Sequence, residues 1–484
     1  MLVLVCVVHF ALGALVGLSV DEAHYALYAA HPALSYFDHP PLVGWVQWPL
    51  VALNTPTAVL RLVPELLWLG TALLVFGLAE RLQGAPSRGQ AGLWAVLAWA
   101  LAPLPHVLGI GLLPDTLLMF WTAALMAATL HLMDASAVQR PGPWLALGVL
   151  LGLAGLSKYT AILAALAVAL CLLVAHGARL LGNRWLWVAV LVALVLVAPV
   201  AVWNYQNHWI SFTYQAQHGA GGGWQAGHVL RFLLIQVLAY GPLLLWGWAG
   251  VRHDRTGPPR SLRLFFAVPF VLLAYLAGGG TSLPHWTAPA WVALAPFAGV
   301  ALARAWHDGR RTPIVALVVL QGLASAALLG LMLTAGAPFI SGAQGQGNTQ
   351  APSNPFADLH GWDAAGQRAR TLAAQHGLAS VSVQNWTLAS RLGWYARPLP
   401  VHVLESRFDQ FTLWAGDLPV GGDTLLVDWS QLAYAVPQGA HGFADCTLLE
   451  QQPVQRLGAT IATFRFYACH RWSGDPQPRL ADSP

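Results

Sequence analysis

Long apolar runs dominate this sequence and decide what it can fold into. A helix that crosses a lipid bilayer needs about 20 apolar residues, and eleven runs of about this length, some shortened by proline or glycine, precede a more polar C-terminal part. Charged residues make up 9% of the chain, whereas roughly a quarter is usual in soluble proteins. The sequence therefore predicts a polytopic membrane protein, mainly α-helical. The expected spans are 1–18, 57–80, 91–104, 115–133, 144–157, 160–176, 185–203, 229–250, 264–279, 286–304 and 313–336.

Basic residues between these runs predict the orientation of the chain. Arginine and lysine gather in cytoplasmic connections. Here a total of twelve arginines is distributed over alternate connections between the apolar runs. This pattern predicts a cytoplasmic N-terminus and an extracytoplasmic C-terminal domain. The scatter of basic residues along the chain argues against nucleic-acid binding. The arginines are Arg81, Arg88, Arg140, Arg179, Arg184, Arg252, Arg255, Arg260, Arg263, Arg304, Arg310 and Arg311.

The first apolar run has a second interpretation, a cleaved signal peptide. Signal peptides begin with a basic segment, but none precedes residues 1–18, and the acidic pair Asp21 and Glu22 follows at once. A retained first span is therefore the expected state.

A change in composition after residue 340 predicts a separate domain. The stretch SGAQGQGNTQAPSNP is typical of a linker. We expect a transmembrane domain over 1–338, a linker over 339–356 and a small α/β domain over 357–484. Helices are predicted at 357–376 and 387–396, and strands at 381–386, 401–405, 423–429 and 462–469.

Two cysteines of this C-terminal part are candidates for a disulfide bond. Cys446 and Cys469 lie 23 positions apart, and an extracytoplasmic compartment would allow them to pair. The pairing requires the 462–469 strand to lie beside a segment near residues 443–450. Cys6 and Cys171 lie in apolar runs and are expected to be inert.

The first predicted outer loop holds the densest group of ionisable residues. The spacing from Asp21 to His31 predicts an amphipathic interfacial helix, and the prolines at 32, 40 and 41 predict an extended turn after it. Carboxylates, imidazoles and phenols at the outer surface suit acid/base chemistry, although a solvated loop with helix-capping acids explains them equally well. The candidates are Asp21, Glu22, His24, Tyr25, Tyr36, Asp38 and His39.

Other candidates lie on the same predicted face. Lys158 is the only lysine in the chain, and its ammonium would suit a phosphate, although it could also snorkel to the interface. Asp115 begins a span, where helix N-capping is the alternative role. His285 precedes the tenth span, where a structural role is the alternative. Asn204 lies at the start of an aromatic loop, whose rings could anchor the chain at the membrane interface or stack against sugar rings.

Several motifs in order along the chain resemble one glycosyltransferase family. DEAHY, YFDHPPL, LLPDTLLMFW, GLAGLSKYT and LPHWTAPAW, followed by DLHGWD, LASRLGWYA and FDQFTLW, resemble family 39 of the GT-C class. This family includes protein O-mannosyltransferases and the aminoarabinose transferases that modify lipid A. The resemblance extends over nearly the whole chain, and it implies the GT-C architecture.

The resemblance also implies a reaction. The donor would be a sugar carried on a polyprenyl phosphate, and transfer would occur with inversion on the periplasmic face of a bacterial inner membrane. The acceptor would be lipid A, another cell-envelope glycan or a protein. Asp21 matches the family's general base for hydroxyl acceptors, and Glu22 completes the acidic pair.

Two positions depart from the family's Phe-Glu-Lys-Pro-Pro motif. Phe37 to Pro41 match it, but Asp38 replaces the glutamate and His39 the lysine. His39 would bind the donor phosphate when protonated, and Lys158, which matches another family lysine, would supply a permanent charge. The substrate-binding candidates are His24, Tyr25, Tyr36, Asp115 and Asn204.

Asp38 and His285 match the positions that share a divalent metal in lipid A-modifying relatives. Two ligands are too few to define a metal site. We therefore expect no certain cofactor and treat a divalent metal as one possibility.

Two other classes compete with the transferase. A transporter or flippase of a lipid-linked sugar would be expected to have two related halves with broken spans, and no internal repeat is detectable. A non-catalytic assembly factor is the third class. The concentration of ionisable residues in outer loops favours the transferase.

Overall fold

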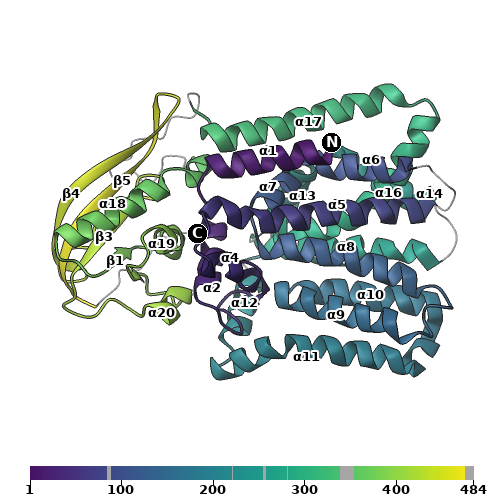
Figure 1. Ribbon diagram of the computed structural model, residues 1–484, viewed down its shortest axis with the longest axis horizontal. Coiled ribbons are helices and arrows are strands. Elements are labelled where there is room, and N and C mark those ends of the chain that lie inside the picture. Colours follow the sequence, from purple (N-terminus) through teal and green to yellow (C-terminus); the bar gives the residue numbers. More distant parts are fainter. Residues whose placement is uncertain (84–88, 221, 254–257, 281, 338–353, 475–484) are drawn as a thin grey trace. The chain divides into compact units, whose positions relative to one another are not determined.

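Figure 1 shows the computed structural model of the chain, which describes residues 1–83, 89–220, 222–253, 258–280, 282–337 and 354–474. The chain divides into two compact units. The helical unit comprises Met1–Phe10 and Pro32–Ala327, and the C-terminal unit comprises Ala11–His31 and Leu328–Pro484. Most of the predicted linker lies outside the described residues. The segment 11–31, which composition alone assigned to the membrane part, groups with the C-terminal unit.

All eleven predicted runs are helical in the described part of the chain. Seven helices are long and apolar enough to cross a membrane, or up to ten spans if each of three bent pairs counts as one. α9 is a shorter apolar helix, so the predicted number of eleven spans is not confirmed. The helices are α1 (Leu2–Leu15), α3 (Leu42–Trp45), α4 (Trp48–Ala52), α5 (Leu62–Gln83), α6 (Gln90–Ala100), α7 (Pro103–Ile110), α8 (Pro114–Leu132), α9 (Pro141–Ser157), α10 (Ala161–His176), α11 (Arg184–Gln206), α12 (Ile210–Ala220), α13 (Ala226–Tyr240), α14 (Trp246–His253), α15 (Leu264–Leu276), α16 (Ala288–His307) and α17 (Arg311–Thr334).

The bends between paired helices have local causes. The pair α6 and α7 bends by 79°, where Pro103 starts α7 and cannot continue the preceding hydrogen-bond ladder. The chain bends by 99° between α13 and the segment that starts at Pro242. Gly241 has φ 74° at this break, a conformation that glycine adopts without steric cost.

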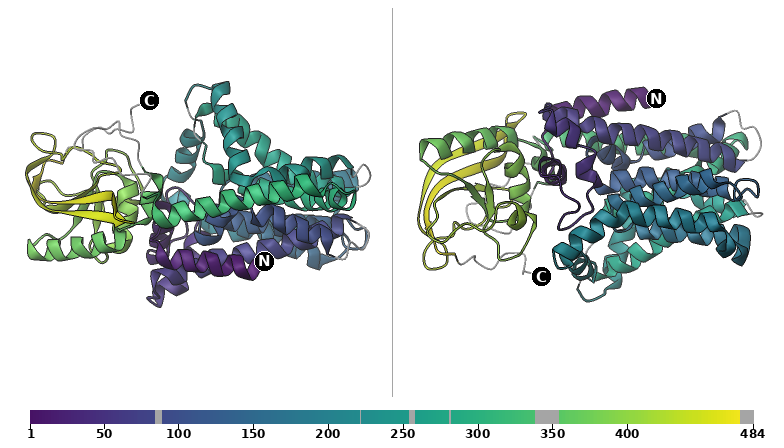
Figure 2. Two further views of the ribbon diagram at one scale, coloured as in Figure 1. Left: turned by 90° about the horizontal axis from the view of Figure 1, so that it is seen from above. Right: turned by 60° about the horizontal axis from the view of Figure 1, so that its bottom comes forward.

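The long helices of the helical unit run side by side (Figures 1 and 2), and α16 is the most buried of the seven long apolar helices. Within the apolar stretch of α16, 94% of the residues are buried, compared with 11% for the corresponding stretch of α11. A helix that is apolar on all sides belongs in a core. α16 contacts α5, α6, α8, α14 and α15.

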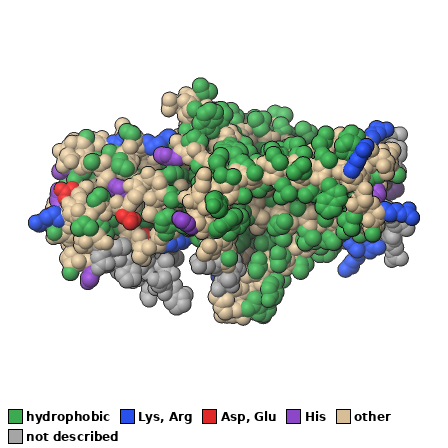
Figure 3. Space-filling view, turned by 90° about the horizontal axis from the view of Figure 1, so that it is seen from below, with side chains coloured by type: hydrophobic (Ala, Val, Ile, Leu, Met, Phe, Trp, Pro, Cys, Tyr) green, Lys and Arg blue, Asp and Glu red, His purple; other side chains and the backbone are tan. Residues whose placement is uncertain are grey.

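Basic side chains gather at one end of the helical unit, beyond its belt of hydrophobic side chains (Figure 3). Eight of the twelve arginines named in the sequence analysis are described and exposed to solvent. This distribution agrees with the arginine pattern of the sequence. The exposed ones are Arg81, Arg140, Arg179, Arg184, Arg252, Arg263, Arg310 and Arg311.

A buried chain of polar groups joins α1 to α5 and α7. His9 Nδ1 lies 2.8 Å from Glu65 Oε2, and His9 Nε2 lies 2.8 Å from His106 Nδ1. His9 also packs edge-on against Trp68. Because buried polar groups need hydrogen-bond partners, these contacts hold α1 in one register. No periodic pattern in the sequence predicts these contacts.

The C-terminal unit contains a mixed five-stranded sheet. The strand order is β2-β1-β3-β5-β4, in which β1, β2 and β3 are parallel and β4 and β5 form an antiparallel hairpin. Leu457 and Gly458 both have positive φ between the paired Arg456 and Ala459, as a two-residue type I′ turn requires. The elements are α2 (Val20–Ala30), α18 (Trp362–Gln375), β1 (Val381–Val383), α19 (Trp386–Tyr395), β2 (Val401–Val403), α20 (Gln410–Trp414), β3 (Thr424–Trp429), β4 (Phe443–Arg456) and β5 (Ala459–Trp472).

These elements confirm the predicted helices and strands of the C-terminal part. α18 and α19 lie in the predicted helical ranges, and β1, β2, β3 and β5 lie at the predicted strands. The sequence prediction missed α20, whose five residues are too few for a periodic pattern. It also named β4 only as a segment near residues 443–450 that would lie beside the last strand.

The predicted disulfide bond between Cys446 and Cys469 is confirmed. The two residues are directly opposed on β4 and β5, with Cα atoms 4.1 Å apart. Their side chains adjoin a core cluster that includes Phe443 and Trp472.

We expect the double variant Cys446→Ser/Cys469→Ser to lose roughly 3 kcal/mol of stability, because the unfolded chain is no longer constrained by the crosslink. Thermal unfolding checks this loss. Thiol labelling of a Cys6→Ala/Cys171→Ala background should modify the remaining pair only after reduction. Labelling of both cysteines in folded, unreduced protein would contradict the bond.

Candidate functional site

Lys158 and Asp115 form a buried ion pair in the helical unit. Lys158 Nζ lies 2.7 Å from Oδ1 and 2.6 Å from Oδ2 of Asp115, and both side chains are less than 10% exposed. Lys158 is the C-cap residue of α9, and Asp115 is the second residue of α8. The interpretation of Asp115 as an N-cap is wrong, because Leu113 occupies that position. Snorkelling of Lys158 is also wrong, because its ammonium is buried on a carboxylate.

Residues before α16 complete the surroundings of this pair. His285 Nε2 lies 3.8 Å from Asp115 Oδ2, and Lys158 Nζ lies 5.7 Å from the centre of the Trp286 ring. Both residues belong to the 3₁₀ helix Pro284–Thr287. The arrangement brings the predicted candidates Asp115, Lys158 and His285 together. A buried ammonium at the end of a helix can bind an anionic group that competes with the carboxylate.

The turn that carries Tyr36, Asp38 and His39 is held mainly by backbone groups. Tyr36 N donates to His39 O at 3.2 Å, and Tyr36 Oη accepts from Ala33 N at 3.0 Å. Gln215 Nε2 donates to the backbone oxygen of Asp38 at 2.6 Å. Tyr36 is fully buried, and burial raises the pKa of its phenol. Tyr36 therefore has a structural role in the turn, whereas the side chains of Asp38 and His39 are only partly buried.

Asn204 belongs to a second polar group in the helical unit. It is fully buried near the end of α11, and its Nδ2 donates to Val200 O at 3.0 Å. Its side chain lies close to the phenol of Tyr159, together with the hydroxyls of Ser35 and Ser211. Burial raises the pKa of the Tyr159 phenol. The sequence prediction missed Tyr159, although it directly follows Lys158.

The helix predicted from Asp21 to His31 is confirmed as α2, in the C-terminal unit. Residues 22–29 are all buried, so the predicted amphipathic, interfacial character is not confirmed. Ser19 caps it: Glu22 N donates to Ser19 Oγ, and Ser19 N donates to Glu22 Oε2 at 3.0 Å. This reciprocal capping box stabilises the first turn. The capping alternative therefore applies to Glu22. Asp21, at the next position before it, is partly exposed.

His24 and Tyr25 lie in an aromatic cluster of the C-terminal unit. His24 is 4% exposed, and its Nδ1 lies 3.0 Å from Ser390 Oγ. Its ring contacts those of Tyr28 and Trp386, with centres 5.1 and 5.6 Å away. These contacts give His24 a packing role between α2 and α19.

Arg391 of α19 is a buried cation that the sequence prediction missed. Its guanidinium lies 4.0 Å from the centre of the Trp362 ring and forms an ion pair with Asp358. Asp358 Oδ2 also accepts from Val20 N at 3.1 Å, so the pair reaches the first turn of α2. Burial lowers the pKa of Arg391 to about 9, and the charge of nearby Asp21 opposes this shift. The sequence offers one signal for Arg391: the arginine lies on the buried side of an amphipathic helix, beside a tryptophan-rich segment.

We expect Arg391→Met to destabilise the C-terminal unit by about 3 kcal/mol or more, because it leaves Asp358 without its buried cation. Arg368→Met is the matched control. The Arg368–Glu450 pair is about one-third exposed on both sides, and such pairs contribute about 0 to 1 kcal/mol. Thermal unfolding of the full chain in detergent compares the two variants. Equal losses of stability in the two variants would show that the buried Arg391–Asp358 pair contributes no more than the partly exposed Arg368–Glu450 pair.

The described residues contain no group of three or more histidine, cysteine, aspartate or glutamate side chains that could hold a metal ion. His285, one of the two predicted metal ligands, lies against Asp115. Asp38 and His285 alone do not make up the ligand set of a metal site in the described part of the chain.

The predicted candidates thus form two sets. Lys158, Asp115, His285 and the Tyr36–His39 turn belong to the helical unit, together with Asn204. Asp21, Glu22, His24 and Tyr25 belong to the C-terminal unit. The prediction treated the first outer loop as one site, but its two halves fold with different parts of the chain.

Known proteins resemble this chain in sequence. The family model for dolichyl-phosphate-mannose-protein mannosyltransferases matches residues 38–203. The lipid A galacturonosyltransferase RgtD of Rhizobium johnstonii is 27% identical over 63% of this chain and 64% of its own length. The lipopolysaccharide core galacturonosyltransferase RgtA of the same organism is 26% identical over 56% and 57%. The chain therefore spans less than two thirds of the length of these curated relatives.

The fold resembles that of ArnT from Cupriavidus metallidurans. The crystal structure bound to undecaprenyl phosphate matches with a TM-score of 0.65 and 18% identity, over 99% of this chain and 98% of ArnT. The apo crystal structure matches with a TM-score of 0.61 and 19% identity, over 87% and 90%. These matches confirm the predicted GT-C architecture as the fold of ArnT, and the family model and the two curated relatives confirm the resemblance to glycosyltransferases.

Proposed function

We propose that this chain, which has the fold of ArnT, is a membrane glycosyltransferase that uses a polyprenyl-phosphate sugar. The single observation that carries the proposal is the match over 99% of the chain to ArnT bound to undecaprenyl phosphate. The names of RgtD and RgtA favour lipid A or the lipopolysaccharide core as acceptor, ahead of another envelope glycan or a protein. They also make galacturonic acid the first sugar to test. A transporter of a lipid-linked sugar is the alternative.

The proposed location is the bacterial inner membrane, with a cytoplasmic N-terminus and a periplasmic C-terminal domain. The arginine-rich end of the helical unit supports a cytoplasmic position for that end. The bond between Cys446 and Cys469 supports an oxidising compartment for the C-terminal domain.

The proposed mechanism is a single displacement with inversion at the anomeric carbon. Lys158 binds the donor phosphate and stabilises its charge as the bond to the sugar breaks. Asp115 keeps the ammonium oriented in the absence of donor. For a hydroxyl acceptor, Asp21 accepts the proton as the oxygen attacks from the opposite face. An acceptor phosphate carries its own negative charge and needs no such base.

The deciding experiment is mass spectrometry of lipid A, lipopolysaccharide core and periplasmic glycoproteins from cells with and without the gene. We expect one envelope glycolipid to lose a defined sugar mass when the gene is deleted. Loss of the same sugar together with accumulation of the lipid-linked sugar on the cytoplasmic side would favour the transporter, whereas accumulation on the periplasmic side would favour the transferase.

We expect donor binding to depend on pH through His39. A bound phosphate favours imidazolium and raises the pKa of His39, so affinity should be highest below that raised pKa and fall as the pH rises through it. His39→Lys should flatten this dependence and retain binding, because lysine stays charged. Binding of undecaprenyl phosphate measured from about pH 5.5 to 8.5 tests both variants. Donor binding that does not change with pH in the wild type would indicate that Lys158 alone binds the phosphate.

A further inference from the structure

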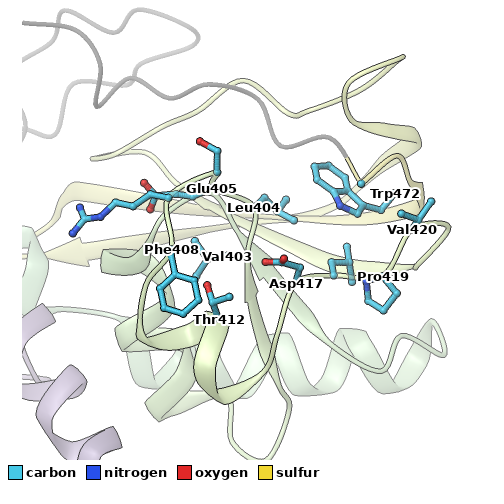
Figure 4. A pocket seen from close by; sticks show the side chains of 13 residues that line it. Val403, Leu404, Glu405, Phe408, Thr412, Asp417, Pro419, Val420 and Trp472 are labelled. Carbon is cyan, nitrogen blue, oxygen red and sulfur yellow. The ribbon is translucent and has the colours of Figure 1, made fainter. Parts of the chain in front are cut away.

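The C-terminal unit contains a cavity of about 420 Å³ that lies apart from all the candidate residues above. It is formed by the connection from β2 to β3, which includes α20, and by the end of β5 (Figure 4). Its volume lies in the range of small-molecule sites. The lining residues used below are Glu405, Arg407, Phe408, Thr412, Asp417 and Trp472.

The floor of this cavity is part of the hydrophobic core. Leu404, Leu418 and Trp472 belong to the same buried cluster as Phe443 and Cys469, and the Trp472 ring lies 4.7 Å from that of Phe443. Backbone hydrogen bonds from Gly421 N to Trp472 O and from Trp472 N to Gly422 O join the cavity wall to β5. The disulfide bond adjoins this cluster, so the floor is preformed.

The rim of the cavity is polar and aromatic. Figure 4 shows the Asp417 carboxylate and the Thr412 hydroxyl between the rings of Phe408 and Trp472. The Phe408 side chain is 41% exposed, and Asp417 is exposed to solvent. Glu405 and Arg407 lie on the same connection. The lining therefore carries two carboxylates and one guanidinium.

We propose that this cavity binds a neutral hexose unit of a glycan. A pyranose ring presents hydroxyl donors at its edge, which carboxylates accept in charge-assisted hydrogen bonds. Its C–H face packs on aromatic rings, whose faces carry negative charge density. The excess of one carboxylate disfavours an anionic sugar. The assignment of this glycan to the acceptor rests on the proposed function.

This site would hold the acceptor glycan through a sugar other than the one that reacts. Binding energy from a non-reacting part of a substrate can position the reacting group. None of the lining residues is a candidate for donor binding or catalysis, so binding at the cavity is separable from transfer.

The test is saturation-transfer NMR with the full-length protein in nanodiscs. The probes are the methyl glycosides of galactose, glucose and mannose, with galacturonic acid as the anionic comparison. We expect saturable binding of at least one neutral glycoside and weaker binding of galacturonic acid. Asp417→Ala and Phe408→Ala should each weaken binding about tenfold, since each removes one of the two proposed interactions. The control Asp445→Ala, which removes an exposed carboxylate on β4 outside the cavity, should leave binding unchanged.

Three outcomes would overturn the proposal: no saturable binding of any neutral glycoside, tighter binding of galacturonic acid, or a loss in Phe408→Ala without a loss in Asp417→Ala. The last result would show that the Asp417 carboxylate does not accept the proposed hydrogen bonds from the hexose. Thermal unfolding checks that the variants are folded. Hexose binding without any envelope change on gene deletion would refute the proposed function alone, whereas an envelope change without hexose binding would refute the cavity proposal alone.

Discussion

Lys158→Met is expected to abolish binding of the polyprenyl-phosphate donor and to destabilise the helical unit by about 3 to 5 kcal/mol. Removing one partner of a buried pair leaves an uncompensated charge, and the Asp115 carboxylate is 2% exposed. Lys158→Arg should retain more donor binding than Lys158→Ala, because the proposed role is charge. Binding of undecaprenyl phosphate and thermal unfolding measure the two effects separately.

The double variant Lys158→Met/Asp115→Asn separates fold from function. Replacing both charges removes the unpaired carboxylate, so most of the lost stability should return. Donor binding should remain absent, because no permanent cation is left at the phosphate. A double variant that is stable and binds undecaprenyl phosphate normally would show that the ion pair is only structural.

Asp21→Asn is expected to lower the transfer rate at least about 100-fold with a hydroxyl acceptor, since general-base catalysis typically contributes 10²- to 10⁴-fold. Asp21 is partly exposed in the first turn of α2, but its charge also opposes the desolvation of Arg391, so thermal unfolding of the variant accompanies the rate measurement. The transfer rate is measured with the acceptor that mass spectrometry identifies, at saturating donor.

Glu22→Gln is the matched control at the neighbouring position. Glutamine can still accept the hydrogen bond from Ser19 N, so the capping box persists, and the loss of stability should be about 1 kcal/mol at most. Transfer should be nearly unchanged. Wild-type turnover in Asp21→Asn with a hydroxyl acceptor would refute its role as the base.

Much of the C-terminal sheet was predictable because its signals are local. A short, continuously buried apolar run marked β3, and alternating apolar residues marked β5. The predicted pairing of the last strand with residues near Cys446 led to the disulfide bond. The apolar runs likewise marked every helix that could span a membrane. The number of spans was less certain, because a run that contains proline or glycine folds either as one helix or as a bent pair.

The sequence by itself determined the membrane class, the helical runs, the α/β nature of the C-terminal part and the family resemblance, because these depend on composition, periodicity and motif order. Only the tertiary structure decided which candidates meet. Lys158 and Asp115 are 43 positions apart and share one buried ion pair, and Arg391 reaches Asp358 and the first turn of α2. Such contacts depend on how distant helices pack, and neither spacing nor periodicity along the chain encodes this packing. The same packing assigned the two halves of the first outer loop to different units.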